Sequence, residues 1–323
     1  MQQDSWPAAL RRISCALLWF AAMTGIHPLS AQDTCSRCLN GFRFMPSSVI
    51  GDPFGATSFT NATGGGMALD LQVPVRDADG NVTDSAGGDI GFLLLDFEYQ
   101  RSILKWLAVR GAVSALGRVG TSTEAIVAGG ASVQFGGSIG ATFPIWRNDK
   151  FAVAGVTDFR RRNQYVVDPY AFARLIADSG FGPGAKEALL RDEKVTHWSA
   201  GARVAWAPLT WLGLNASVEP GRIDSPTLGD RSLTGMGIQA AVDFDHLWNF
   251  PLGTSIGWQQ RTGPGRRGEF AGSYRSWELG LFYTGASSFT IGTDFFWQRL
   301  AVDRAVLPDL KAVQFRLVTR LDF

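Results

Sequence analysis

Hydrophobic and polar positions alternate along most of the chain, from about residue 66 to the carboxyl terminus. In the last run, the apolar residues from Val313 to Phe323 share one parity and Arg316 and Arg320 share the other. A period of two indicates a β-strand with one apolar face. The pattern predicts about twelve strands, over residues 66–75, 89–100, 106–118, 131–143, 150–160, 197–207, 212–221, 234–244, 252–261, 274–284, 288–299 and 311–323.

The predicted connections alternate in length. Short ones fall at residues 101–105, 144–149, 208–211, 245–251 and 285–287, and long ones at 76–88, 119–130, 161–196, 222–233, 262–273 and 300–310. An even number of antiparallel strands joined in this way leaves both ends of the sheet on the same side.

One parity of the predicted strands is apolar in strand after strand, and the other carries the charged side chains. If the apolar parity faces lipid, the charged parity faces an enclosed lumen, because an arginine exposed to the bilayer midplane costs about 2 to 4 kcal/mol. We expect the field in this lumen to be mixed in sign, with Arg110, Arg118, Arg316 and Arg320 on one wall and Asp96 and Glu98 opposite. The expected lumen-lining residues are Asp70, Asp96, Glu98, Arg110, Arg118, Asp158, Arg203, Glu219, Glu278, Asp294, Arg316 and Arg320.

The carboxyl-terminal strand ends on Phe323. This ending resembles the closing strand of Gram-negative outer-membrane β-barrels, whose terminal aromatic residue and preceding alternate apolar residues form an assembly signal. The resemblance covers residues 66–323. It implies an all-β fold, a closed antiparallel transmembrane barrel with short periplasmic turns and long extracellular loops. It assigns the assembly signal to Phe323, Leu321 and Phe315, and it implies that the outer-membrane assembly machinery and outer-membrane lipids are partners.

Tryptophan positions favour the membrane interpretation over a soluble sandwich. One group lies beside short connections and the other near the opposite strand ends, as the two aromatic belts of a membrane barrel would. The first group is Trp106, Trp146, Trp211 and Trp248, and the second is Trp198, Trp258, Trp277 and Trp297.

The amino-terminal region is typical of a secretory signal. Arg11 and Arg12 precede an apolar run, and cleavage is expected after Ala31, which makes residues 1–31 a signal peptide for Sec export to the outer membrane. Residues 32–65 are expected to form an irregular periplasmic or lumenal leader. Within it, Cys35 and Cys38 are a candidate disulfide, because thiols pair in an oxidising compartment.

The longest connection, residues 161–196, contains helix signals. Asp168 and Pro169 suit the N-cap and first position of a helix that would end at Gly180, and a second helical piece is expected over residues 185–194. Such an extracellular helical loop would act either as a lid over the mouth or as a packed surface loop.

The net charge of +1 argues against a nucleic-acid partner, and the residues form no recognised cofactor or metal motif. His197 is a weak candidate for catalysis at the extracellular rim, since no recognised acid or serine pattern accompanies it. The leading interpretation is a narrow channel or selective transporter for small solutes, and not an enzyme. The alternatives are a rim hydrolase acting on lipid or peptide, and a closed structural or adhesive barrel.

Overall fold

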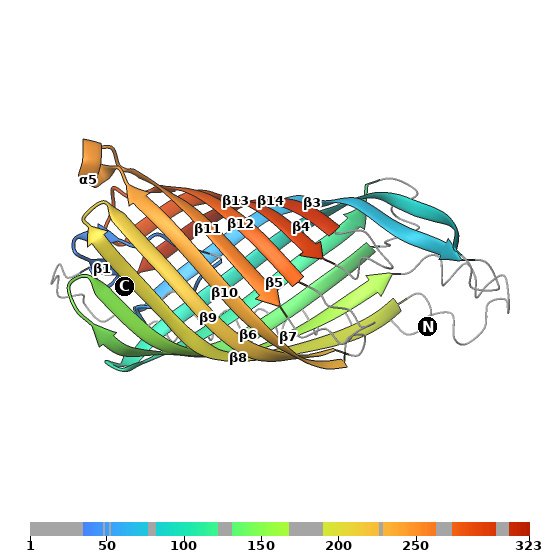
Figure 1. Ribbon diagram of the computed structural model, residues 1–323, viewed down its shortest axis with the longest axis horizontal. Helices are drawn as coiled ribbons and strands as arrows, with labels where there is room; N and C mark the ends of the chain where they lie inside the picture. Colours follow the sequence, from blue (N-terminus) through green and yellow to red (C-terminus); the bar gives the residue numbers. More distant parts are fainter. Residues whose placement is uncertain are drawn as a thin grey trace, which may run out of the picture. The chain divides into compact units, whose positions relative to one another are not determined.

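Twelve consecutive antiparallel strands, β3 to β14, form a closed barrel in which β14 pairs with β3 (Figure 1). The computed structural model describes residues 35–47, 49–51, 53–76, 82–121, 131–167, 190–225, 229–262, 273–301 and 310–323. The expected signal peptide and its cleavage site lie outside these residues. The strands are β3 (Ser58–Arg76), β4 (Val82–Leu104), β5 (Leu107–Gly120), β6 (Ala131–Arg147), β7 (Phe151–Val167), β8 (Leu190–Leu209), β9 (Leu212–Ser225), β10 (Gly229–Asp243), β11 (Leu252–Thr262), β12 (Ser273–Tyr283), β13 (Phe289–Ala301) and β14 (Leu310–Asp322).

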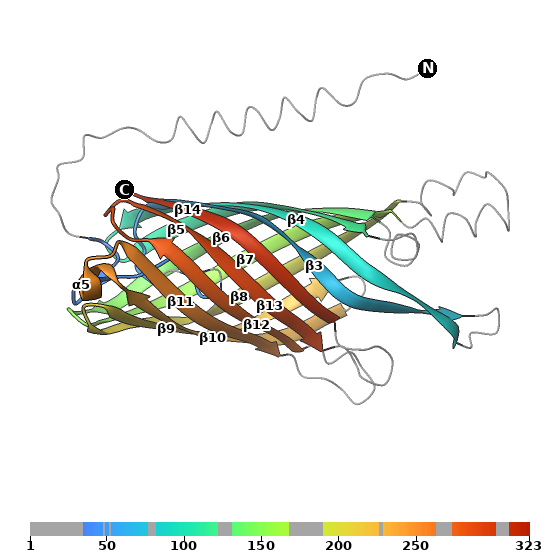
Figure 2. The same cartoon turned by 90° about the horizontal axis from the view of Figure 1, so that it is seen from above.

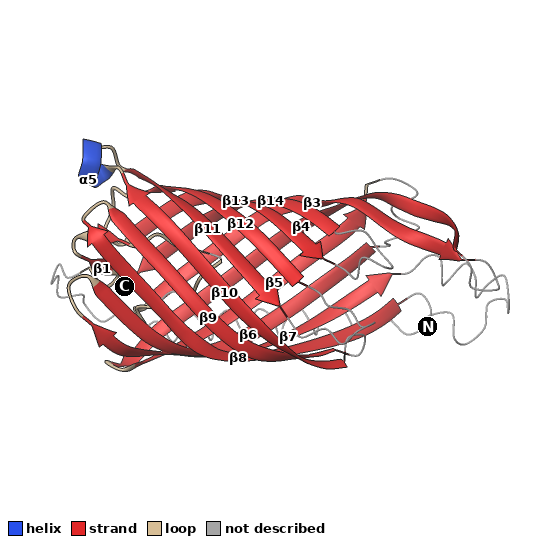
Figure 3. Cartoon of the chain, in the orientation of Figure 1, coloured by secondary structure: helices blue, strands red, loops and turns tan. Residues whose placement is uncertain are grey.

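The all-β fold and the closed barrel are confirmed. Three small elements accompany the barrel. Strands β1 (Cys38–Leu39) and β2 (Phe42–Arg43) pair with each other ahead of it, and α5 (Asp245–Trp248) lies in the turn between β10 and β11. Figure 3 shows that α5 is the one helix in the described part of the chain. No helix among the described residues is long and apolar enough to cross a membrane.

Several strands extend beyond the expected ends. β3 begins at Ser58 rather than at residue 66, because Gly64, Gly65 and Gly66 interrupt the apolar alternation without preventing hydrogen bonding to β14. The expected long connection 222–233 is largely strand, since β9 and β10 remain paired up to Ser225 and Gly229. Backbone pairing needs no apolar face, so it continues where the alternation of side chains has stopped. Paired strands β3 and β4 likewise reach past their neighbours (Figure 2).

The prediction of a second helix over residues 185–194 is wrong for residues 190–194, the part that the structure describes. Leu190 to Lys194 begin strand β8 and pair with Val167 to Asn163 of β7. The extended β7 edge supplies hydrogen bonds to this segment, and tertiary pairing of this kind overrides a weak helical preference. The expected helix from Asp168 to Gly180, and with it the question of a lid, lies outside the described residues.

The outer face of the barrel is apolar and carries tryptophans toward both ends. Trp106, Trp146 and Trp248 are exposed at the end that holds the short turns, and Trp277 and Trp297 are exposed toward the other end. The expected outward residues of β13 and β14, among them Phe295 and Phe315, are also exposed. An apolar band with flanking aromatic residues is the outer surface of a membrane barrel.

Candidate functional site: the lumen and its internal plug

The leader folds inside the barrel. We call its described residues within 35–56 the plug. Its apolar side chains are buried, and Phe42 is 0% exposed. The rings of Phe42 and Phe44 meet edge to face with centroids 4.9 Å apart, and Phe44 lies 5.1 Å from Phe54. This cluster packs on small and apolar side chains of the inner wall: Ala62, Ala152, Ala205, Ala207, Ala241, Phe282 and Val318.

The wall is shaped to accept the plug. A side-chain carbon at Gly213 of β9 would collide with the ring of Phe42, and one at Gly253 of β11 would collide with the Met45 thioether. Alanine and glycine therefore occupy inward positions at this end because larger residues would fill the space that the plug needs.

A tight hairpin and a disulfide shape the first part of the plug. Asn40 and Gly41 both have positive φ, 51° and 82°, as the two central residues of a type I′ turn require. They join β1 to β2, in which Cys38 pairs with Arg43. Cys35 and Cys38 form a disulfide with a Cα–Cα distance of 5.3 Å.

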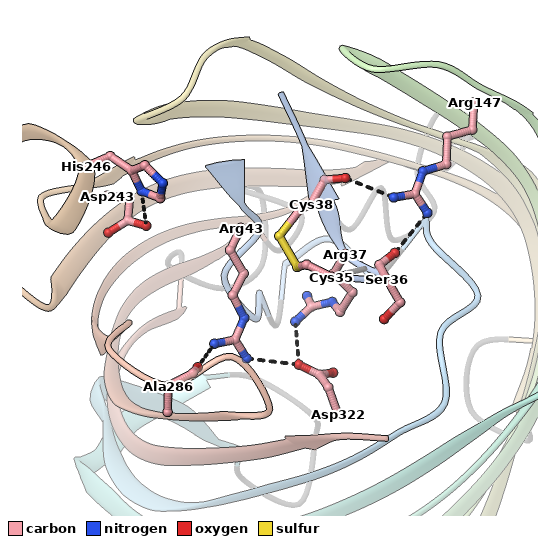
Figure 4. The surroundings of a disulfide bond; sticks show 10 residues. All are labelled: Cys35, Ser36, Arg37, Cys38, Arg43, Arg147, Asp243, His246, Ala286 and Asp322. Atoms are coloured by element: carbon pink, nitrogen blue, oxygen red, sulfur yellow. Dashed lines mark hydrogen bonds and ion pairs between the residues drawn. A yellow bond between two sulfur atoms is a disulfide. The ribbon is translucent and has the colours of Figure 1, made fainter. Parts of the chain in front are cut away.

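Polar contacts attach this hairpin to the turn end of the barrel. Arg147 donates hydrogen bonds of 2.9 Å to the carbonyls of Ser36 and Cys38 (Figure 4). The Asn40 amide donates to the carbonyls of Ala207 and Pro208 at 3.3 and 3.2 Å. These contacts come from the ends of β6 and β8, beside the short turns, so the plug joins parts of the barrel that are far apart in sequence.

Asp322, the last residue of β14, is shared by three arginines. Its carboxylate accepts a hydrogen bond from Arg43 at 3.1 Å, and Arg37 lies 3.7 Å away (Figure 4). It also accepts a hydrogen bond of 2.8 Å from Arg320. Arg43 also donates to the carbonyl of Ala286. Arg320, which we expected on the lumen wall, is buried and binds Asp322 and the Ser58 hydroxyl, so it shares Asp322 with the plug arginines.

Glu278 of β12 contacts the middle of the plug, at Ser47 and Val49. It is 1% exposed and accepts hydrogen bonds from the Ser47 hydroxyl at 3.0 Å and from the Val49 amide at 3.2 Å. Sequence reasoning placed Glu278 in the lumen. There it binds the plug backbone, which gives a buried carboxylate the donors it needs.

Between the plug and the barrel end away from the short turns, charged side chains that face the lumen form ion pairs. Most of these pairs join strands that are adjacent or two strands apart. Among the described residues the ion pairs include Arg110 to Glu98 at 3.5 Å, Arg110 to Asp158 at 3.3 Å, Arg160 to Asp158 at 3.4 Å, Arg203 to Glu219 at 2.8 Å and Arg316 to Asp294 at 3.3 Å. The Arg316 guanidinium also lies 4.2 Å from the centre of the Phe296 ring. These pairs rigidify the wall and reduce its net field.

The expected arrangement of opposite walls is wrong. Asp96 and Glu98 lie on β4, and β3 and β4 separate β14 from β5 in the barrel, so the acids stand between the two sets of arginines. Arg118 of β5 donates a hydrogen bond of 2.9 Å to the Ser132 hydroxyl. Asp70 lies in the part of β3 whose side chains are not described.

Arg160, Arg162 and Arg261 form a basic cluster, which we call the arginine cluster, farther from the turns. Arg160 and Arg261 are both close enough to Arg162 to repel it electrostatically. Among the described residues, no carboxylate lies within ion-pair distance of Arg162 or Arg261. The sequence did not predict that Arg162 and Arg261 line the lumen, because both lie at the ends of predicted strands. The alternation Asp158, Arg160, Arg162 would have revealed the first of them.

His197 lies beside the arginine cluster, directly opposite Arg160 in the β7–β8 ladder. It shares a small polar pocket with Arg261, Ser199, Ser217, Glu219, Gln259, Leu233 and Gly235. No hydrogen bond among the described residues joins His197 to a serine or a carboxylate. The arrangement is therefore that of a polar lumen wall, since a general base must lie within hydrogen-bond reach of its partners.

No protein-family model matches the chain, and no curated protein matches it. Solved structures that it resembles include the translocator domain of the autotransporter NalP from Neisseria meningitidis, with 8% identity, a TM-score of 0.48 and coverage of 83% of this chain and 88% of that one. The NanC porin matches with 8% identity, a TM-score of 0.45 and coverage of 82% and 100%. The Pseudomonas putida toluene transporter TodX matches with 11% identity, a TM-score of 0.39 and coverage of 82% and 88%.

The architecture itself determines the class of protein. A membrane-spanning sheet must be closed so that no backbone group remains unsatisfied in lipid, and β3 to β14 close in this way. Transmembrane barrels also have an even number of strands, an apolar outer face and aromatic residues near both ends, and this barrel has all three features. The chain folds as a closed transmembrane β-barrel of the outer-membrane type.

Proposed function

We propose that the barrel is a gated channel for small solutes that carry an anionic group. The observation that carries this proposal is the arginine cluster. These three side chains lie near one another on the lumen wall, farther from the short turns than the plug. A solute entering from that end would meet Arg160, Arg162 and Arg261 before it reached the plug.

Electrostatic magnitudes support a modest preference for anions. A unit charge about 8 Å from an ion contributes roughly 0.5 kcal/mol at the dielectric constant of water, so three charges give about 1.5 kcal/mol, or about tenfold. Asp158 and Glu219 offset part of this field. We therefore expect a permeability ratio for chloride over potassium of about 2 to 10.

The plug supplies the gate. Its buried aromatic residues fill the lumen at the turn end, so conduction requires the plug to move within the barrel or to leave it. The described polar attachments include the contacts of the hairpin with Asp322 and the turns, those of Ser47 and Val49 with Glu278, and the hydrogen bond from Gln100 to the Ala56 carbonyl. A gate held by such discrete contacts opens when they break, while the strand ladders remain intact.

The dense attachment of the plug also favours a second candidate, a permanently closed structural barrel. The two candidates differ in what lies behind the plug. A channel has an aqueous path once the plug is absent, whereas a structural barrel remains filled by its own side chains. A rim hydrolase has no comparable support, because His197 lacks a hydrogen-bonded partner among the described residues.

The test is a planar-bilayer recording with purified protein. We expect the full chain to give small, infrequent openings and a variant lacking residues 35–56 to give steady conductance with reversal potentials that indicate anion preference. The triple variant Arg160→Gln, Arg162→Gln and Arg261→Gln, made in the plug-free barrel, should lose that preference. Arg161→Gln is the matched control, because Arg161 lies between two cluster residues but points away from the lumen. A silent plug-free barrel would rule out the channel, and unchanged selectivity of the triple variant would rule out the arginine cluster as its cause.

A further inference from the structure

Gly235 of β10 lies on the lumen wall between an acidic and a basic residue. It is directly opposite Glu219 in the β9–β10 ladder and directly opposite Arg261 in the β10–β11 ladder. Adjacent strands are about 4.8 Å apart, so the backbones of Glu219 and Arg261 are separated by roughly 10 Å. Gly235 has no side chain to occupy the space between them, and all three residues line the small polar pocket beside His197. We call Glu219, Gly235 and Arg261 the Glu–Gly–Arg row.

The two charged groups of this row attract each other but do not form an ion pair. Each lies within electrostatic range of the other, yet Glu219 pairs with Arg203, whose Nε donates a hydrogen bond of 2.8 Å to Oε1. The other carboxylate oxygen, Oε2, accepts no hydrogen bond from the residues that the structure describes, and the Glu219 side chain is 22% exposed. One carboxylate oxygen and the Arg261 guanidinium therefore both remain available to a solute in the pocket.

The remaining side chains of the pocket are mainly polar. Ser199, Ser217 and Gln259 add hydroxyl and amide groups, and Leu233 adds an apolar side chain. A small-molecule site of this kind selects its ligand by a few placed polar groups. A purely anionic ligand would be attracted by Arg261 and repelled by Glu219, whereas a ligand that also carries an ammonium group would be attracted by both.

We propose that the Glu–Gly–Arg row binds a small zwitterion of the amino-acid type, with its carboxylate on Arg261 and its ammonium group on Glu219. Arginine donates paired hydrogen bonds that match a carboxylate, and hydrogen bonds between charged groups are the strong ones. Such a zwitterion would be a solute of the proposed channel, so the site rests on that function. Its binding can nevertheless be measured without conduction.

Gly235 leaves room for the carbon atoms that join the two charged groups of the ligand. A carbon added at Gly235 would lie 3.4 Å from the Glu219 carbonyl oxygen and 3.7 Å from Cγ of Arg261. These are ordinary contact distances, so the added carbon would occupy the space without displacing the wall. A methyl group at this position should therefore exclude the ligand and leave the barrel folded.

The test measures binding of L-alanine and L-lactate to the purified full-length barrel in detergent, by titration with saturation-transfer difference NMR. The two probes differ in that lactate has a hydroxyl group in place of the ammonium group. Because hydrogen bonds between charged groups are stronger than neutral ones, we expect L-alanine to bind about tenfold more tightly than L-lactate. L-Alaninamide, which lacks the carboxylate, should also bind about tenfold more weakly than L-alanine. Equal binding of L-alanine and either analogue, or no detectable binding of L-alanine, would overturn the proposal.

Two variants test the row itself. Glu219→Gln keeps the shape of the side chain and removes its charge, so L-alanine and L-lactate should then bind within about twofold of each other. Gly235→Ala should weaken L-alanine binding about fivefold or more by filling the space beside Arg261. It serves also if Glu219→Gln fails to fold because Arg203 loses its charged partner. A preference for L-alanine that survives in Glu219→Gln, or undiminished binding in Gly235→Ala, would overturn the proposal.

Glu98→Gln and Gly117→Ala are the matched controls. Glu98 also pairs with an arginine, Arg110 at 3.5 Å, but does not line the pocket. A carbon added at Gly117 meets no atom within 4 Å. Both controls should retain the preference for L-alanine, and its loss in them would overturn the assignment to the Glu–Gly–Arg row.

The site and the channel can fail separately. A plug-free barrel that conducts anions but binds L-alanine and L-lactate alike would overturn the zwitterion site and support the channel. A barrel that binds L-alanine with the expected preference but stays silent in a planar bilayer without its plug would support the site and overturn the channel.

Discussion

The Asp322 carboxylate accepts a hydrogen bond of 3.1 Å from the Arg43 guanidinium, joining the last residue of the closing strand to the plug. The two residues are separated by nearly the whole barrel sequence, and they meet because β14 returns to pair with β3. The strand that closes the barrel therefore also holds its internal plug. This contact lies at the turn end, which we expect to face the periplasm because short turns do so in outer-membrane barrels.

Replacing Asp322 with Asn should loosen the plug. The substitution removes the charge that Arg37, Arg43 and Arg320 share, and we expect it to destabilise the plug by about 1 to 3 kcal/mol, since hydrogen bonds to charged groups contribute on this scale. Hydrogen exchange of amides 36–45 should accelerate while the strand amides remain protected. Asp322→Glu is the control because it keeps the charge. Unchanged exchange in the Asn variant would show that the shared carboxylate does not retain the plug.

Gly213→Ala should displace Phe42. The added methyl group would collide with the Phe42 ring, and overpacking of this kind costs about 1 to 3 kcal/mol. We expect faster proteolysis of the plug in the folded barrel, measured by mass spectrometry of the released fragments. Gly111→Ala is the matched control, because a carbon at Gly111 meets no atom within 4 Å. If both variants behave alike, the plug does not press on the wall at Gly213.

Reducing the disulfide should affect the plug and spare the barrel. Cys35 and Cys38 enclose a very short loop, for which the chain-entropy model gives about 2 kcal/mol. The double variant Cys35→Ser and Cys38→Ser should therefore raise hydrogen exchange around β1 and β2 only. The urea midpoint for barrel unfolding should stay the same. A lower midpoint would mean that the disulfide stabilises the strands as well.

Phe323→Ser should impair insertion into the outer membrane. The side chain is 58% exposed, directly after β14 and on the parity of its lipid-facing residues, where the family resemblance assigns the assembly signal. The measurement is the fraction of protein that runs as folded barrel on unheated gels of outer-membrane preparations. Phe250→Ser is the control, since Phe250 is 54% exposed at the same end but lies in the β10–β11 turn. Equal insertion of both variants would argue against a signal at Phe323.

The sequence by itself determined the strands and their outward faces, because both follow from local alternation. The alternation of apolar and polar positions is enough to assign Phe295, Trp297 and Phe315 to the lipid-facing side. The closing strand is identified by the alternating residues that lead to its terminal phenylalanine. The same periodicity predicted the even number of strands. The periodicity gave the wrong strand ends at Ser58 and Leu190, because hydrogen bonding between the strand backbones continues there without an apolar face.

Only the tertiary structure decided which charges meet. Arg110 pairs with Asp158 two strands away, and Asp322 gathers Arg37 and Arg43 from the leader. Such contacts depend on the closure and register of the sheet and on the path of a segment with no periodicity of its own. For the same reason, the alanines and glycines that line the turn end gave no signal in the sequence. Their small size acquires meaning only when Phe42 and Met45 occupy the space beside them.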